Sequence, residues 1–213
     1  MEFNAVLESR HSVRYFLDTP IDDSVLTNLV LQAQLSPSWI NAQEHKVWIA
    51  TGEVLEKIRE QYHAKFEEGI KGYADLPVTS RETWSAQAQQ NMKTFSQSRI
   101  DAGLQEIKEL SESYLFHAPA VAYLTLPKNH NDWALLDLGT FEMTMMLAAA
   151  NVGLGSVPAY NLVKYPDVLR DLLGIPEDEK LIIGIALGYA ADVPLNSFRS
   201  TRQPVENILT IKK

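Results

Sequence analysis

The chain has 213 residues, of which 46% are hydrophobic and 22% are charged, and it contains no cysteine. This composition is typical of globular proteins, so collagen-like, fibrous and disordered classes are excluded, as are disulfides, thiolate metal sites and iron–sulfur clusters. Nineteen Lys and Arg against 27 Asp and Glu give a net charge of −8, the wrong sign for a nucleic-acid-binding face. We expect one domain over residues 1–213 and no nucleic-acid partner.

The N-terminal segment and the least charged stretch argue against secretion and membrane insertion. The first 16 residues include two Glu and no apolar run, whereas a secretory signal needs one of roughly 7–15 residues. Residues 143–163 carry no charge, but Asn, Gly and Pro interrupt them, and a spanning helix needs about 20 mostly apolar residues. We expect a cytoplasmic protein with no membrane partner.

The spacing of apolar residues predicts the main elements. In chain order these are a helix over 22–36, a strand over 46–50, a helix over 54–66, a strand over 119–126, a helix over 131–150, a helix over 166–173 and a strand over 181–188. Pro37 ends the first helix, because the residue before a proline avoids helical geometry. Pro166 and Gly174 are the start and stop signals of the sixth element.

Three further segments complete this organisation. The helix over 131–150 has apolar residues on every side, which predicts burial nearly all round, and a turn and strand follow at 153–158. Residues 69–113 are polar, and we interpret them as a helical excursion over the core, in the manner of a lid. The tail over 189–213 has little periodicity and is interpreted as an arm lying on another surface.

Four of the eight arginines lie in two short segments at opposite ends of the chain, Arg10 with Arg14 and Arg199 with Arg202. The guanidinium fork matches phosphate, and segment 10–14 adds a serine hydroxyl and turn-type backbone donors. In an acidic chain such segments indicate a small anionic ligand. Solvated surface charge is an equally good interpretation of the same residues.

The other motifs exclude more chemistry than they indicate. Gly153-Leu-Gly-Ser156 follows a helix and lacks a third glycine, so it is no dinucleotide fingerprint; a helix stop and a close backbone approach explain its glycines better. The histidines show no metal-ligand spacing, and neither G-x-S-x-G nor a local carboxylate pair occurs. We therefore expect no metal and no catalytic side chain, and infer that a bound cofactor carries the chemistry.

Six motifs occur in a fixed order along nearly the whole chain: Arg10–Phe16, Ser36–Gln43, Gly153–Ser156, Leu173–Pro176, Ala186–Tyr189 and Arg199–Pro204. This series resembles the FMN-dependent nitroreductase family. Residues 133–202 are most similar to the branch that includes the nitrobenzoate reductases.

The resemblance implies an α+β fold: a three-layer α-β-α sandwich with a mainly antiparallel central sheet, a buried central helix and a C-terminal arm. It implies a homodimer with two FMN molecules at the subunit interface and with residues 69–113 over the site. NADH or NADPH would reduce the flavin, and a small electron-poor acceptor such as a nitroaromatic or a quinone would reoxidise it, in alternate two-electron steps. Flavin N5 rather than a side chain would carry the hydride.

The resemblance also implies a set of cofactor-binding residues. Arg10, Ser12 and Arg202 would hold the FMN phosphate, with His11 beside them and Arg199 as an addition to this group. Arg14 would lie at the pyrimidine end of the flavin, where a cation stabilises the charge of the reduced state. Residues from two further segments would approach the ring: Ser38, Trp39 and Asn41 from the other subunit, and the backbone of Pro158, Ala159, Tyr160 and Asn161 near N5. Part of the family has Glu-Gly where this chain has Tyr160-Asn161.

Other interpretations of the same residues remain open. Trp39 is also explained as a packed aromatic residue, and Asn41 as a turn residue. A flavin-binding protein without turnover, acting as a reservoir or sensor, is the alternative to an enzyme. A binding domain for another phosphorylated metabolite is a third hypothesis.

Overall fold

The structure, a computed structural model, describes residues 1–104 and 108–213, and the chain divides into two compact units. The first unit consists of Met1–Val78 and Glu106–Asn196, and the second of Thr79–Gln105 and Ser197–Lys213. One domain over residues 1–213 stays a prediction.

The first unit is built on a four-stranded antiparallel sheet in the order β1-β2-β4-β3. Its strands are β1 (Lys46–Thr51), β2 (Ala120–Pro127), β3 (Gly155–Ala159) and β4 (Glu179–Gly188). Successive residues of β2 enter different clusters: Val121 and Tyr123 face one core, Ala122 and Leu124 the other. Because side chains alternate along a strand, this central strand is apolar on both faces. A hydrophobic core therefore lies on each face of the sheet.

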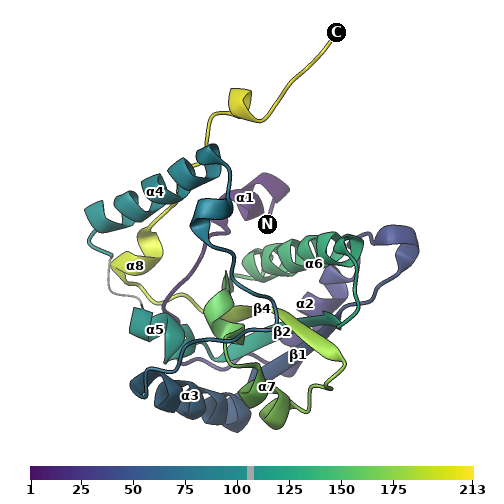
Figure 1. The fold of residues 1–213 in the computed structure, drawn as a ribbon, viewed down its shortest axis with the longest axis vertical. Helices are drawn as coiled ribbons and strands as arrows, with labels where there is room; N and C mark the ends of the chain where they lie inside the picture. Colours follow the sequence, from purple (N-terminus) through teal and green to yellow (C-terminus); the bar gives the residue numbers. More distant parts are fainter. Residues whose placement is uncertain (105–107) are drawn as a thin grey trace. The chain divides into compact units, whose positions relative to one another are not determined.

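Helices form the outer layers on both sides of the sheet (Figure 1). On one side lie α3 (Gly52–Glu67) and α7 (Pro166–Leu173), and on the other α2 (Asp23–Ala33) and α6 (Asp132–Asn151). The shorter helices of this unit are α1 (Phe3–Ser9) and α5 (Lys108–Glu112), and α8 (Pro194–Ser197) lies at its C-terminal boundary. This arrangement confirms the predicted three-layer α+β fold with a mainly antiparallel sheet.

The predicted helices and strands are confirmed, with small changes at their ends. Helix α7 has Pro166 in its first turn and ends at Gly174, whose φ of +70° is the left-handed conformation that favours glycine. Helix α2 ends at Ala33, earlier than predicted, because Leu35 and Ser36 bond back to Gln32 and Ala33 in a tighter turn. The predictions missed the short helix α1.

Helix α6 corrects the prediction of burial nearly all round. Leu138, Phe141 and Met145 are buried against the sheet, but Leu136 is 59% exposed and Trp133 51% exposed. The exposed apolar residues recur at helical spacing, so they form a stripe along one face of α6. In the single chain, one apolar face of α6 is exposed, so the prediction that this helix is buried nearly all round is wrong.

The tail prediction also needs correction, because its first part is packed. Phe16 forms an antiparallel bridge with Ala190, and both Ala191 and Asn196 are buried. The bonding partners of these residues lie near the N-terminus, which is why no local periodicity marks them. Residues 199–213, in the second unit, are all exposed, and Val205–Asn207 among them form a short 3-10 turn.

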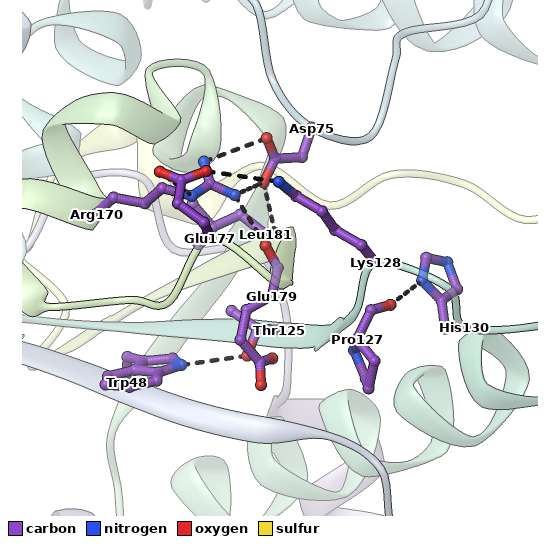
Figure 2. Close-up of polar contacts among 10 residues, drawn as sticks. All are labelled: Trp48, Asp75, Thr125, Pro127, Lys128, His130, Arg170, Glu177, Glu179 and Leu181. Carbon is purple, nitrogen blue, oxygen red and sulfur yellow. Dashed lines mark hydrogen bonds and ion pairs between the residues drawn. The ribbon is translucent and has the colours of Figure 1, made fainter.

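The excursion over 69–113 is helical in its middle and end, with α4 (Ala86–Asp101) in the second unit and α5 in the first. Its first part, up to Val78, contains no helix or strand and belongs to the first unit. Asp75 forms an ion pair with Arg170 at 2.6 Å and accepts a hydrogen bond from Leu181 N at 2.9 Å (Figure 2). This second bond lies where the pairing of β2 and β4 shifts register. The carboxylate thus completes an irregular part of the sheet. A position of the excursion over the site stays a prediction.

A left-handed turn precedes β2. Leu115, Phe116 and His117 have φ values of +49°, +62° and +56°, a conformation that costs free energy for residues other than glycine. Arg59 of α3 donates from Nε to Tyr114 O at 3.1 Å and from Nη2 to Ala118 O at 2.9 Å. The guanidinium therefore bonds the backbone on both sides of the turn and stabilises it.

We expect Asp75→Asn to lower the free energy of unfolding by about 1.5–3 kcal/mol, the usual contribution of a hydrogen bond to a charged group. The Asp75 carboxylate is 17% exposed and its partner Arg170 is 12% exposed. The measurement is denaturant unfolding followed by circular dichroism. The control is Glu177→Gln, whose carboxylate is 83% exposed and should contribute less than about 1 kcal/mol. Equal losses in the two variants would contradict this role of Asp75.

Candidate functional site

The N-terminal basic segment lies beside the start of β3. Ser12 pairs with Ser156 in a parallel bridge, and Val13 N donates to Ser156 O at 3.0 Å. A Cβ added at Gly155 would lie 2.6 Å from Val13 Cγ2, which is too close for any side chain. Gly153 has a φ of +81° and follows the end of α6. The interpretation of these glycines as a helix stop and a close backbone approach is confirmed.

A cavity of about 190 Å³ opens where these segments meet, lined among others by Arg10, His11, Gly153, Ser156 and Ala190. Two basic side chains therefore share a cavity with the glycine-containing turn. His11 Nδ1 lies 2.7 Å from Ser9 O, and Arg14 Nη1 donates to Ser12 O at 3.1 Å. Guanidinium, imidazole and hydroxyl groups in one segment fit a phosphate monoester.

The far end of β3 carries the second group of predicted residues. Pro158 and Ala159 end the strand, and Tyr160 and Asn161 begin a 3-10 helix, Tyr160–Val163. Asn161 Nδ2 donates to Ser111 Oγ at 2.9 Å, so its side chain contacts α5. Four residue steps along the strand lead from Ser156 to Tyr160, or about 13 Å. The cavity beside Arg10 is lined by Gly155 and Ser156 of β3 but not by Pro158 to Asn161, so the two ends of the strand are separate places in this chain.

Ser38, Trp39 and Asn41 lie in a separate loop against the start of α6. Trp39 N donates to Asp137 Oδ2 at 2.9 Å, and the Trp39 ring stacks on Trp133 with centroids 4.4 Å apart. Ser38 Oγ accepts a hydrogen bond from Gln43 N at 3.2 Å. Asn41 has a φ of +60°, which asparagine tolerates better than most residues. Trp39 is thus a stacked aromatic residue, yet it is 51% exposed.

His45 lies close to this loop. A smaller cavity, of about 90 Å³, is lined by Trp39, His45, Trp133 and Asp137 among others. The His45 ring packs on Phe141 at 4.2 Å, and burial lowers the pKa of His45 below its usual value, opposed by the nearby Asp137 carboxylate. The neutral imidazole is therefore favoured at pH 7.

The basic segment around Arg10 and the loop that carries Trp39 lie at opposite ends of α6. Asp137 bonds Trp39, and Ala150 lines the cavity with Arg10. Thirteen helical residues separate Asp137 from Ala150, which is about 20 Å. Within one chain, the structure brings Arg10, His11 and Ser12 together with β3, and does not bring Trp39 to them.

Arg199 and Arg202 belong to the second unit, and both are exposed. Arg202 Nη1 donates to Ser200 Oγ at 2.8 Å and to Thr201 O at 3.0 Å. These bonds fold the side chain back on its own segment. A role of either arginine at the phosphate stays a prediction.

The sequence analysis missed the side chain that fixes the backbone of Arg14. Asn196 Oδ1 accepts a hydrogen bond from Arg14 N at 2.8 Å across 182 residues of sequence. A long-range contact of this kind leaves no local signal, and Asn196 lies in a segment without periodicity.

In the part of the chain that the structure describes, no helix is both long and apolar enough to cross a membrane.

Comparisons with known proteins show the family to which the chain is similar. A model described as the nitroreductase family matches residues 7–189. The 4-nitrobenzoate reductase of Pseudomonas putida is 28% identical over 209 residues, covering 95% of this chain and 92% of the relative. The nitrobenzene nitroreductase of Ectopseudomonas oleovorans is 24% identical over 214 residues, covering 96% and 94%.

A solved structure shows the same fold. The FMN-dependent nitroreductase NfnB from Mycobacterium smegmatis, in complex with NADPH, superimposes with a TM-score of 0.90 at 24% identity. The similarity covers 99% of this chain and 97% of that one. At this identity the likeness describes the fold alone.

Proposed function

The chain belongs to the nitroreductase family, and we propose that it is an FMN-dependent oxidoreductase that uses NADH or NADPH to reduce nitroaromatics, quinones or similar electron-poor compounds. The observation that carries this proposal is the cavity at the start of β3, which Arg10 and His11 line together with the turn after α6. Relatives that span nearly the whole chain reduce nitrobenzoate and nitrobenzene. A cytoplasmic location stays a prediction.

The residues present fit FMN. Arg10 and Ser12 supply a guanidinium and a hydroxyl for a phosphate, with His11 beside them, and Arg202 is assigned to the same group. The backbone from Ala159 to Asn161, about 13 Å away along β3, would face the flavin ring. When bound, FMN takes a hydride from the nicotinamide and passes two electrons to the acceptor.

Arg14 has a chemical role in this proposal rather than a purely binding one. Its cation faces the pyrimidine end of the flavin, where negative charge exists only after reduction. A contact that is stronger in the reduced state favours uptake of the hydride, whereas a uniform contact only tightens binding. Arg14 thus raises the midpoint potential of the bound flavin.

A second copy of the chain completes the site. Leu136 of α6 is 59% exposed. Leu35 and Ile40, which are close to Trp39 in the sequence, are 84% and 87% exposed. An exposed apolar surface of this kind is typical of a protein interface. A partner packed on this face in the opposite orientation along α6 places its Ser38, Trp39 and Asn41 at the cavity of the first chain. We therefore propose a homodimer.

The visible spectrum of the purified chain with FMN tests the activity. NADPH or NADH should bleach the absorbance of bound FMN, and 4-nitrobenzoate or a quinone should restore it. A flavin that binds and stays oxidised would favour the reservoir or sensor hypothesis. A chain that takes up no FMN would show that the proposal is wrong and favour another phosphorylated ligand.

Arg10→Ala and Arg202→Ala should each weaken FMN binding about 10- to 100-fold, because a charge-assisted hydrogen bond contributes about 1.5–3 kcal/mol. Quenching of FMN fluorescence measures the dissociation constant. The control is Arg81→Ala, an exposed arginine outside the six motifs. If the affinity falls as little as in this control, the assignment of the phosphate site is wrong.

Leu136→Arg should convert the homodimer into a monomer and weaken FMN binding, because it places a charge in the apolar face of α6. Sedimentation velocity gives the oligomeric state. Val54→Arg is the matched control: Val54 is also apolar and partly exposed, at 38%, but lies in α3 on the other side of the sheet. A monomeric wild-type chain with full FMN affinity would exclude the proposed contribution of Trp39 across the interface.

A further inference from the structure

The side-chain amide of Asn196 uses both of its acceptor positions and both of its donor hydrogens. Oδ1 accepts hydrogen bonds from Arg14 N at 2.8 Å and from Tyr15 N at 3.2 Å. Nδ2 donates to Tyr15 O at 2.7 Å and to Ala191 O at 2.8 Å. Asn196 is 7% exposed, so these bonds form away from bulk water, where an unpaired polar group is costly.

The backbone around Arg14 explains why a side chain is needed there. Beyond it, the segment pairs with the C-terminal part of the unit: Leu17 N donates to Tyr189 O at 2.9 Å, and Ala191 N donates to Tyr15 O at 3.1 Å. In a regular strand, successive N–H groups point to opposite sides. Here the N–H groups of Arg14 and Tyr15 converge on one oxygen, so the chain turns at this point.

We propose that Asn196 is the positioning residue for Arg14, and this inference rests on the proposed function. Asn196 fixes the backbone from which the guanidinium extends, and the bond from Arg14 Nη1 to Ser12 O at 3.1 Å restricts the side chain further. Asn196 touches no reacting atom. It acts on the chemistry through Arg14, by holding that cation where the charge of the reduced flavin arises.

The chemistry of the site explains why the residue is asparagine. Two neighbouring N–H groups require an acceptor, and two carbonyl groups require a donor, and a carboxamide supplies both in one planar group. Asn196→Ala removes the acceptor and the donor together. Asn196→Asp keeps the acceptor but directs a second oxygen at Tyr15 O and Ala191 O. The Asp variant has the same size as asparagine and leaves the two acceptor bonds in place, so it is a second variant that tests the donor bonds separately.

The first test uses the protein without FMN. Hydrogen exchange of the Arg14 and Tyr15 amides should be at least tenfold faster in Asn196→Ala than in the wild-type chain, equivalent to about 1.4 kcal/mol. The matched control is Asp75→Asn, which weakens a part-buried polar contact elsewhere in the unit, at Arg170 and Leu181 N. Unchanged exchange at Arg14 and Tyr15 would overturn the proposal.

The second test measures the midpoint potential of bound FMN. Asn196→Ala should lower it in the same direction as Arg14→Met, and a tenfold change in the equilibrium corresponds to about 30 mV for this two-electron couple. Because Asn196 acts through Arg14, the double variant should match Arg14→Met alone. Asp75→Asn should lower the free energy of unfolding and leave the midpoint potential of bound FMN at the wild-type value.

Two results would make Asn196 a purely structural residue: a wild-type potential in Asn196→Ala despite lower stability, or additive shifts in the double variant. The failure of the proposed function is a separate outcome. If the wild-type chain binds no FMN, the proposal that it is an FMN-dependent oxidoreductase is wrong. The amide exchange still decides whether Asn196 fixes the backbone of Arg14.

Discussion

The segment that carries Arg10 and Arg14 can lie against β3 only because residue 155 has no side chain, since a Cβ there would lie 2.6 Å from Val13 Cγ2. This approach allows Val13 N to bond Ser156 O, and it brings the basic segment to the turn that follows α6. The cavity at the start of β3 and its basic lining follow from that one contact. The backbone pairing of Val13 with Ser156 therefore positions the segment that carries the two arginines.

Much of the fold could be predicted because its signals are local. Pro166 and Gly174 mark the ends of α7, and the apolar runs mark β2 and β4, as the structure confirms. Of the candidate site, the approach of the Gly153–Ser156 turn to the backbone was predictable for the same reason. The bonds of Asn196 were not, because Arg14 and Asn196 are 182 residues apart and neither residue alone indicates the other.

The error about α6 has a different physical origin. An apolar residue such as Leu136 indicates that a surface is kept from water, but not whether the same chain or another one covers it. The single chain leaves this face exposed and separates Trp39 from Arg10 by the length of the helix. In the proposed homodimer, one set of exposed residues accounts for both observations, since covering the face and completing the site require the same partner.

The chain on both sides of the second unit's helical segment is anchored independently of that segment. Before it, Asp75 bonds Arg170 and Leu181 N. After it, Ser113 Oγ lies 2.6 Å from His63 Nδ1, and Arg59 bonds Tyr114 O and Ala118 O. Lengthening a loop between fixed ends costs little free energy. Residues 79–104 are therefore an exchangeable module: related proteins can differ there in length and composition, and an engineer can replace them, while the sheet and its flanking helices keep their structure.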